Sequence, residues 1–532
     1  MLVCGCACQP VALNGTASTA RTASAARTPV EGGTFTEAIV GSVGTLSPLY
    51  AEEDNAREIS ALIYEGLTRT GPDQQPEPVL ARQIQVSGDG LTYSVFLRTD
   101  ARFADGVAFS ADDVVFTYAA LQDPTYTGPG ASNWKGVTIR KVASDRVDFS
   151  LRSPSAGFPA SLRIGILPRH LFTGTDAASI SASPFSGPKA LGTGPFMVDS
   201  ISADRMTVRL KRNPNARHAA RLQSIIFRGY GRLAEAASAV GRGDADGVGS
   251  LDSPELVALG REPGVHLLDA RSFTFVALLF DESAGSPFAS AAVRRAFAQA
   301  IDRRSLIAGV LSGRADAQNT CLPASDWAYS QTAADKYPYD VGGAGKILDD
   351  AGWTLAPQAL VRTHGSTELS VEVMAADIYP YRELAQELRR QLTVLGARVT
   401  VKLVPAADLA SRNLATRNYQ SVLASFDNGP DPDQFAFWHS SNRGYALNFS
   451  TLPKQSFIDK DLEDGRSRLD RTARLGAYDD LQLLLADAAP AAFLYEPHYL
   501  YAVNDRVGGV RLDATVGPPD RFDYVSDWYL TR

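Results

Sequence analysis

Hydrophobic and polar positions repeat with two different periods after residue 33, and these periods predict strands and helices in turn. Residues 91–97 (LTYSVFL) alternate with the period of two expected for a strand. Residues 54–69 instead repeat their apolar positions with the helical period, and Asp54 is expected to cap this helix. Ser110 and Asp113 have the spacing of a capping box and predict the start of another helix.

The second half of the chain has the clearest pattern. Residues 273–281 (FTFVALLFD) form a nearly continuous apolar run, which predicts a buried strand. Further on, the pattern predicts strands and helices in the order β-α-β-α-β, at residues 369–374, 381–395, 399–403, 407–418 and 420–426. This order favours an α/β domain with a largely parallel sheet. Open sheets of this kind bind ligands at the carboxyl ends of their strands.

The periodic pattern is absent before residue 33. This segment is rich in Ala, Thr and Ser, and we expect a flexible tether of about 25 residues that spans ~25–30 Å. Three cysteines lie before this Ala/Thr/Ser-rich stretch, at positions 4, 6 and 8. A small residue followed by Cys after an aliphatic position resembles a bacterial lipoprotein processing site, with Cys6 or Cys8 as the lipidated residue. The alternatives are a disordered end with chance cysteines or a weak metal site, and only Leu2 and Val3 precede the first Cys.

Composition excludes several classes of protein. The chain has 532 residues and a formal net charge of −7, and it has no basic block, so nucleic acid is not an expected partner. No run approaches the ~20 apolar residues of a membrane-spanning helix. Cys321 is the only cysteine of the body, which excludes a disulfide framework there and predicts a buried structural thiol.

Motifs for catalysis are not found in the sequence. It contains neither a Walker loop nor an H-E-x-x-H motif, and no G-x-S-x-G elbow stands out between a strand and a helix. We therefore expect no enzyme, no catalytic residue, no cofactor and no metal site. Carboxylates do cluster in the segment 427–433, DNGPDPD. This segment is either a Pro/Gly turn after a strand or a binding loop with an Asp facing a cationic group of a ligand.

Several segments together resemble one family, the family 5 solute-binding proteins of ABC importers, which includes oligopeptide, dipeptide and nickel binders. Residues 44–48 and 62–67 resemble its opening, and residues 87–97, 103–106 and 111–114 resemble its long signature. The segments 192–196 (GTGPF), 294–303 (RRAFAQAIDR) and 337–340 (YPYD) are further hallmarks. Each match is weak alone, but their number and order carry the assignment.

The resemblance implies a fold and an organisation. The fold is the α/β class II periplasmic-binding-protein fold, with two hinged lobes, mixed and parallel sheets, and an extra domain in the first lobe. We expect a lipobox-like start and tether at 1–32, a lobe I core at 33–77, 191–272 and 503–532, an extra domain at 78–190, and lobe II at 273–502. Ligand is enclosed between the lobes of such a protein, and the closed form is presented to a membrane permease.

The resemblance also implies charged ligand contacts. Dipeptide binders of the family pair the ligand's ammonium group with an Asp and its carboxylate with an Arg. Their Asp loop resembles residues 426–435 here, which makes Asp427 the candidate for the ammonium group. Aligning Asp431 and its neighbours with the family's Asp-Pro pair moves that position to Asn428 instead. Arg382, near the start of the helix at 381–395, is the candidate for the carboxylate.

Aromatic residues complete the expected site. Phe426 opens the Asp loop, Trp438 follows it, and Trp327 and Tyr329 lie in a stretch resembling the family's ligand-side loop. Aromatic walls accept varied side chains through contact area. Core packing is the alternative role, and we expect it for at least one of the three residues at 327, 329 and 438.

The resemblance finally predicts a role in the cell. We expect a monomeric, lipid-anchored receptor on the outer face of the bacterial cytoplasmic membrane, with short peptides as ligands and an ABC permease and ATPase as partners. Peptides bind to such receptors in an extended form, through backbone hydrogen bonds like those of an added strand. Two alternatives remain open: the same fold with a non-peptide ligand such as a nickel chelate or an oligosaccharide, and a peptide sensor without transport.

Overall fold

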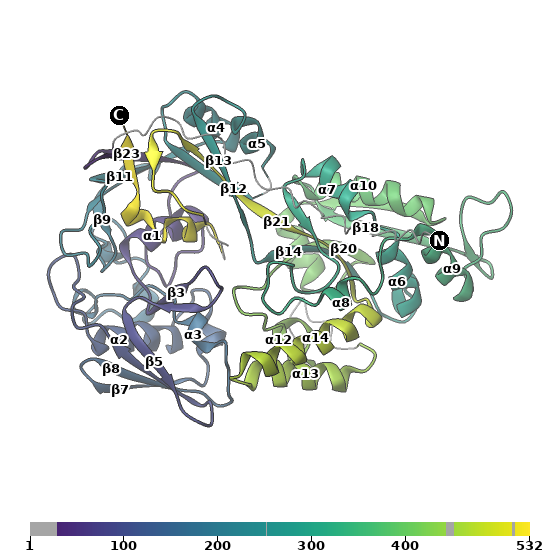
Figure 1. Cartoon of the computed structure of the whole chain (residues 1–532), viewed down its shortest axis with the longest axis horizontal. Coiled ribbons are helices and arrows are strands. Elements are labelled where there is room, and N and C mark those ends of the chain that lie inside the picture. Colours follow the sequence, from purple (N-terminus) through teal and green to yellow (C-terminus); the bar gives the residue numbers. More distant parts are fainter. Residues whose placement is uncertain (1–28, 252, 443–451, 513–516, 532) are drawn as a thin grey trace, which may run out of the picture.

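The computed structural model describes residues 29–251, 253–442, 452–512 and 517–531. Its helices and strands form two lobes that lie side by side (Figure 1). The cysteines expected to carry a lipid, Cys6 and Cys8, fall outside the described residues. Within those residues, none of the helices combines the length and the apolar character needed to cross a membrane.

Lobe I, on the left of Figure 1, is built on one part of the largest sheet. Its strands, in spatial order, are β12 (Gly247–Leu251), β2 (Thr34–Val40), β11 (Ser224–Tyr230), β10 (Thr207–Arg212) and β9 (Phe196–Ile201). β2 runs parallel to both β11 and β12, whereas β10 is antiparallel to its two neighbours. The helices α4 (Leu233–Gly241) and α5 (Pro254–Leu259) bury an apolar cluster against one face of this sheet.

A second, four-stranded sheet lies at the lower end of lobe I (Figure 1). Its antiparallel strands, in spatial order, are β5 (Ala81–Val86), β6 (Thr92–Leu97), β8 (Arg146–Ser150) and β7 (Thr138–Ala143). The helix α2 (Ala111–Gln122) packs against it and begins with the predicted capping box of Ser110 and Asp113. This sheet falls within the range expected for the extra domain, and the boundaries of that domain stay a prediction.

The sheet of lobe II is mixed. Its strands are β14 (Thr274–Phe280), β20 (Ser421–Asp427), β18 (Ser370–Ala376) and β19 (Arg398–Val404). β18 is parallel to β19 and β20, as the β-α-β-α-β order predicts, but β14 is antiparallel to β20. The parallel sheet predicted at residues 369–426 is therefore confirmed, and β14, which lies outside that range, makes the sheet of the lobe mixed.

The apolar run of β14 is buried on both faces, as its composition predicts. Val276, Leu278 and Phe280 contribute to one hydrophobic core, while the intervening residues contribute to a second core on the opposite face. The helices and short strands around these cores and at the edges of both lobes are α6 (Ala291–Gln299), α7 (Arg303–Val310), α8 (Gln331–Ala334), α9 (Val341–Asp350), α12 (Phe435–Trp438), α13 (Gln455–Ser467), α14 (Arg471–Ala488), α3 (Phe158–Ser161), β1 (Pro29–Val30), β3 (Thr68–Thr70), β4 (Pro76–Pro78), β16 (Thr363–His364), β17 (Thr367–Glu368), β22 (Val507–Gly508) and β23 (Tyr529–Thr531).

The two helices predicted in the second half of lobe II agree with the structure to different degrees. α10 (Tyr381–Val394) is confirmed, and Leu384, Leu388 and Leu392 on its predicted face are buried. The helix predicted at 407–418 is wrong in form: a short turn of α11 (Ala406–Asp408) leads into a π-helical turn at residues 409–414. Its wider hydrogen bonding shifts the side chains out of the simple helical period.

The helix predicted at 54–69 is shorter than its pattern suggests. It is α1 (Asp54–Ile63), and Asp54 is its first helical residue, while Glu53 occupies the cap position. The chain is extended at Tyr64, and Gly66 then passes so close to another segment that a Cβ there would lie 2.5 Å from the carbonyl oxygen of Arg163. The apolar positions beyond Ile63 therefore belong to the connection toward β3.

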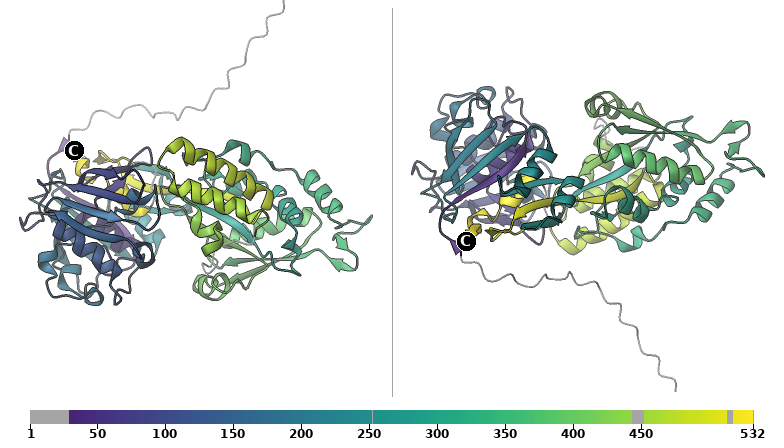
Figure 2. Two further views of the ribbon diagram at one scale, coloured as in Figure 1. Left: turned by 90° about the horizontal axis from the view of Figure 1, so that it is seen from below. Right: turned by 90° about the horizontal axis from the view of Figure 1, so that it is seen from above.

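One long strand, β21 (Ala491–Asn504), belongs to both lobes. Its first half pairs with β14 and with β15 (Ala315–Ala317) in lobe II, and its second half pairs with β12 and with β13 (Val265–Arg271) in lobe I. Figure 2 shows how this strand and the β13–β14 connection bridge the two lobes. These two crossings form the hinge.

The C-terminal segment completes the core of lobe I through a buried ion network. The Arg521 guanidinium is 1% exposed and donates to Glu37 on β2 at 2.7 Å and to Glu58 on α1 at 2.6 and 2.7 Å. The Tyr501 hydroxyl on β21 donates to Glu37 at 2.8 Å. The network thus joins two N-terminal elements, β2 and α1, to β21 and the C-terminal segment.

Candidate ligand-binding site

A cavity of about 740 Å³ lies between the lobes. Most of its wall comes from lobe I: from α1, from loops around residues 65–69, 163–165 and 216–218, and from the C-terminal segment 517–526. Lobe II contributes Thr274 at the start of β14 and Asp427 at the end of β20. The position agrees with the expectation that ligands bind at the carboxyl ends of strands, since β20 ends at the cavity.

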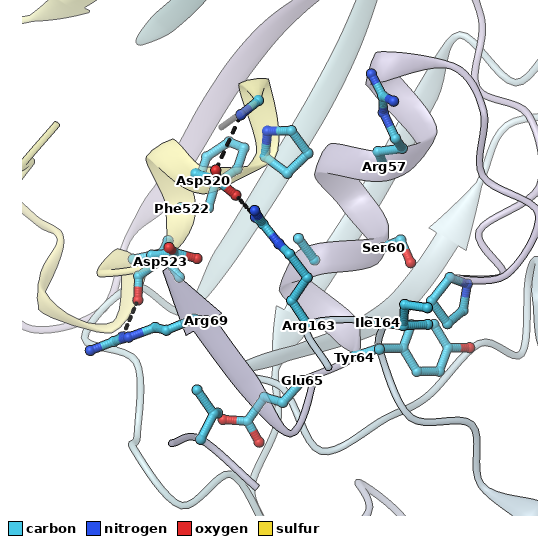
Figure 3. Close-up of a pocket in the computed structure, with 18 of the residues that line it drawn as sticks. Arg57, Ser60, Tyr64, Glu65, Arg69, Arg163, Ile164, Asp520, Phe522 and Asp523 are labelled. Atoms are coloured by element: carbon cyan, nitrogen blue, oxygen red, sulfur yellow. Dashed lines mark hydrogen bonds and ion pairs between the residues drawn. The ribbon is translucent and has the colours of Figure 1, made fainter. Parts of the chain in front are cut away.

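The lobe I wall is rich in charged side chains, and several are held in ion pairs (Figure 3). Arg163 is paired with Asp520, and Arg57 is paired with Asp54. Arg69 is bonded to Glu77 at 3.0 Å and donates to the carbonyl oxygen of Asp523 at 3.2 Å. These contacts fix three guanidinium groups before any ligand arrives.

Burial alters the ionisation of the acidic side chains in this wall. Burial and the neighbouring Asp520 raise the pKa of Asp523 to about 8, against the opposing charge of Arg163. Burial also raises the pKa of Glu65, although Arg217, Arg98 and Arg69 pull it down. The Asp523 carboxyl therefore takes up a proton more readily than a solvent-exposed Asp does.

Asp427 is the acidic side chain that lobe II presents to the cavity. Its Oδ1 accepts a hydrogen bond from the backbone N–H of Gly429 at 2.9 Å, as in a turn-capping Asp. Desolvation by the surrounding walls raises the pKa of Asp427, while Gly429 and the charge of Arg163 lower it. Its carboxylate has no cation within 4 Å in the part of the chain that the structure describes.

Asn428 is committed to contacts within lobe II. Its Nδ2 donates to the carbonyl oxygen of Cys321 at 3.3 Å, and its Oδ1 accepts from Gln434 at 2.7 Å. Gln434 in turn accepts from the indole N–H of Trp438 at 3.0 Å. This chain of bonds leaves Asn428 as part of the lobe II structure. Cys321 itself is buried, as predicted, and burial raises its pKa to about 12.

Two of the aromatic candidates are buried in the core of lobe II. Trp438 is fully buried, and Phe426 stacks on Phe275 with 4.8 Å between ring centroids and 3° between ring planes. Phe426 points away from Asp427 because successive residues of a strand face opposite sides. Neither ring is among the described residues that line the cavity.

Trp327 and Tyr329 lie in the loop 323–330, beside a contact between the lobes. The side-chain amide of Gln74, at the tip of the β3–β4 hairpin, donates to the carbonyl oxygen of Ser325 and accepts from the Trp327 N–H at 3.2 Å. The Arg471 guanidinium lies 4.6 Å from the centroid of the Trp327 ring. These residues flank the lobe–lobe contact rather than the cavity wall, as far as the described chain goes.

Arg382 lies at the start of α10 and is exposed. Its Nε donates to Asp377 at 2.6 Å, and an Nη donates to the carbonyl oxygen of the same residue at 2.9 Å. It is not among the described residues that form the wall of the cavity. Its role in binding stays a prediction, as do the roles of the other candidates.

Sequence reasoning overlooked the loop residues of lobe I. Arg98 follows β6, Arg163 follows α3, and Arg217 and His218 lie between β10 and β11, yet all four line one cavity. No spacing in the sequence connects them. Only Arg98 carries a local signal, because it directly follows the strand predicted at residues 91–97.

Comparison with known proteins identifies the chain. The family model of bacterial extracellular solute-binding proteins, family 5, matches residues 75–446, which is more than half of the chain. The oligopeptide-binding protein AppA of Bacillus subtilis is 24% identical over 518 residues, covering 95% of this chain and 93% of the relative.

Solved structures show the same fold. AppA of Bacillus subtilis in complex with a nonapeptide superposes with a TM-score of 0.74 at 22% identity, covering 95% of this chain and all of that one. NikZ of Campylobacter jejuni in complex with Ni(L-His) has a TM-score of 0.75 at 23% identity, covering 93% and 99%. The relatives are substrate-binding proteins of ABC transporters, not enzymes, and they act outside the cytoplasm. The chain belongs to the family 5 extracellular solute-binding proteins of ABC transporters.

Proposed function

We propose that this chain captures short peptides between its lobes and delivers them to the permease of an ABC importer. The observation that carries the proposal is the placement of Asp427, which lines the cavity from lobe II and has no cation of its own among the described residues. A peptide's free ammonium group would supply the cationic partner that this carboxylate lacks. Charge-assisted hydrogen bonds of this kind are about twice as strong as neutral ones.

The contacts of Asn428 support Asp427 as the residue that meets the ammonium group. Both residues stand near the start of the Asp loop, but the amide of Asn428 is already bonded to Cys321 and Gln434. Releasing it would leave two polar partners unsatisfied within lobe II, which is unfavourable. The carboxylate of Asp427 needs no such rearrangement.

The end of β20 also suits an extended peptide. β18 pairs with β20 at Ser421 and Val422, and no further pairing of these two strands is found in the described chain. β20 continues beyond this pairing to Asp427. A peptide lying there could bond to backbone groups in the manner of an added strand, which gives affinity with little dependence on side chains.

A chelate or another non-peptide solute is the second candidate. The cavity wall carries five arginines and five acidic residues, so it offers partners to many polar solutes. NikZ, with the same fold, is described in complex with Ni(L-His). In the described part of this chain, no three His, Cys, Asp or Glu side chains are grouped to hold a metal ion, so a metal would have to arrive with its own ligands. A peptide sensor without transport is a third possibility.

Membrane attachment through a lipid on Cys6 or Cys8 is part of the same proposal. β1 pairs with β23, so the chain enters lobe I beside its C-terminal strand. An anchor before residue 28 would therefore hold the protein by lobe I. Metabolic labelling with a radioactive fatty acid tests this: we expect label on the wild type, reduced in Cys6→Ala or in Cys8→Ala, and label retained by the double variant would contradict it.

Native mass spectrometry of the protein, purified without unfolding, tests the ligand. We expect a distribution of bound masses that fragment as short peptides. Their range of lengths would say whether both ends of the peptide are held. A single discrete non-peptide mass would contradict the peptide proposal and favour the second candidate. An adjacent permease gene would favour import over sensing.

A further inference from the structure

We infer that Arg217 and Arg98, with His218 beside them, form an anion subsite in the lobe I wall that binds a carboxylate group of the ligand. The inference rests on the proposed function, because it concerns the same cavity, and it adds the chemistry of the ligand's second charged group. It also places that group on lobe I, opposite Asp427 of lobe II.

Arg217 is the central residue of this subsite. It lies in the loop between β10 and β11, and its Nη1 donates to Nε2 of His218 at 2.7 Å. Its Nε is buried and finds no hydrogen-bond partner in the described chain. A buried guanidinium nitrogen without an acceptor is unfavourable, because it has lost its hydration without gaining a hydrogen bond. A ligand oxygen in the cavity would supply the missing acceptor.

Arg98 brings a second guanidinium to the same wall. Its Nε donates to the carbonyl oxygen of Val79 at 2.7 Å, which fixes the base of the side chain. No carboxylate lies within 4 Å of Arg98 or of Arg217 among the residues that the structure describes, unlike Arg57, Arg69 and Arg163. Of the five arginines that line the cavity, these two are left for a ligand.

The neighbouring side chains report a positive potential at this place. Desolvation, followed by the charges of Arg217, Arg98 and Arg69, lowers the pKa of His218. A neutral His218 agrees with the hydrogen bond from Arg217, since Nε2 must be unprotonated to accept it. The imidazole can then orient Arg217 without adding a like charge.

The charge balance selects one anionic group. The charges of Arg217, Arg98 and Arg69 all lower the pKa of Glu65, so this side chain shares their electrostatic environment. The charge of Arg69 is already compensated by its ion pair with Glu77. Arg98 and Arg217 carry two positive charges and Glu65 can offset at most one of them, so at least one positive charge remains uncompensated. A single carboxylate neutralises it, and guanidinium groups bind carboxylates in a two-point geometry. The shared chemistry covers a peptide's C-terminus and an acidic side chain.

The test measures how much of the binding depends on ligand carboxylates. The ligands released from the purified protein are divided, and one half is amidated with carbodiimide and ammonium chloride, which turns carboxylates into amides. Both halves are then added back to the stripped protein, and affinity is measured by native mass spectrometry. We expect amidation to weaken binding to the wild type by about tenfold to a hundredfold.

Variants assign this effect to the subsite. Arg217→Gln should bind the untreated ligands about tenfold more weakly than the wild type and show little further loss on amidation. Arg217→Lys should recover part of the loss, because it keeps the charge without the two-point geometry. The matched control is Arg390→Gln on α10, which removes an exposed arginine paired with Glu387 far from the cavity wall. It should bind like the wild type.

Failure of the inference is distinct from failure of the peptide proposal. If amidation leaves binding unchanged, or if Arg217→Gln binds the untreated ligands as tightly as the wild type, the subsite is refuted even where the ligands are peptides. If the ligands are non-peptide but lose binding on amidation, the subsite stands and the peptide proposal falls.

Two additional probes complete the test. If the purified protein carries nothing, a tetrapeptide library ending in a carboxylate and one ending in an amide replace the released ligands, and equal binding or no binding of both refutes the subsite. Peptides with an amidated end and an acidic side chain then distinguish the two sources of the carboxylate. The amidation result on the wild type does not depend on the folding of any variant.

Discussion

The two lobes build their shares of the cavity differently. Lobe I supplies most of the wall, and three of its arginines are held by ion pairs or hydrogen bonds within the lobe. Beneath that wall, Arg521 connects Glu37 and Glu58 in the core. Lobe II supplies little more than Thr274 and the carboxylate of Asp427.

The difference separates stability from selectivity. The three paired arginines of lobe I, Arg57, Arg69 and Arg163, need little reorganisation when a ligand arrives, so this part of the wall is preorganised. Under the proposed function, the carboxylate of Asp427 on lobe II gains its cationic partner only when a ligand is enclosed. Changes beneath the lobe I wall should therefore lower the stability of the fold, whereas changes at Asp427 should lower affinity.

The largest expected effect comes from removing the support of the lobe I wall. Arg521→Met leaves the two buried carboxylates of Glu37 and Glu58 without their shared cation. Breaking a buried ion pair by removing one partner costs about 3–5 kcal/mol. We expect the free energy of unfolding of lobe I, measured by urea titration, to fall by about that amount.

The matched control for Arg521 lies in lobe II. Arg474 is also largely buried, but it is paired with one carboxylate, that of Asp431, which is partly exposed. Arg474→Met should lower the free energy of unfolding by less, about 1–3 kcal/mol. Equal losses in the two variants would mean that the lobe I network has no special part in stability.

The second effect concerns the lobe II side of the comparison. Asp427→Asn keeps the shape of the side chain and its bond from Gly429 but removes the charge. We expect the affinity for peptides with a free amino group to fall by more than about tenfold, with no change for N-acetylated peptides. Isothermal titration calorimetry on the two peptide sets measures this, and equal affinity for both sets in the wild type would exclude Asp427 from the site.

Local patterns predicted the scaffold better than the site. The leucines of α10 and the apolar run of β14 each bury one continuous segment, so their period alone identifies them. Beyond the end of α1, Gly66 packs against Arg163, a contact between segments almost a hundred positions apart that no local pattern contains.

The site follows the same rule. Asp427 was predicted because it directly follows a strong strand and stands in a recognisable loop, and it does line the cavity. Arg98 and Arg217 were not predicted, because each stands in an ordinary loop and the two come together only in the folded cavity wall. A residue such as Arg382 looks functional in sequence, yet its charge is satisfied locally by Asp377. Local sequence cannot show which charges remain unpaired after folding.

The smallest of these effects lies at the hinge, where the two halves of the comparison meet. His498 on β21 has Nδ1 at 2.7 Å from Asp269 of lobe I and Nε2 at 3.4 Å from Asp316 of lobe II. Burial alone would lower the pKa of His498, but the two carboxylates outweigh it and raise the pKa to about 9. Arg314, Arg271 and Glu496 complete this charged group.

The direction of the pH dependence follows from that shift. Because the folded pKa of His498 lies above the ordinary value near 6.5, its contribution to stability is fully present below about pH 6.5 and is lost as pH rises through about 9. We expect the wild type to exceed His498→Gln by on the order of 1 kcal/mol at pH 6 and by much less at pH 10. A stability difference that stays constant across this range would rule out the charged imidazole as its source.

The buried bond between Glu37 and Arg521 joins positions 484 residues apart, and this separation has a consequence for biogenesis. A ribosome that adds ~5–20 residues per second needs about 25–100 s to make the residues between them. Until Arg521 has been made, Glu37 on β2 lacks the cation that neutralises it, and β2 lacks its neighbour β12 until nearly half of the chain exists. The first lobe begun is thus the last one finished. A chain that passes through a translocation channel must be unfolded, and this topology prevents lobe I from completing its fold until most of the chain has been made.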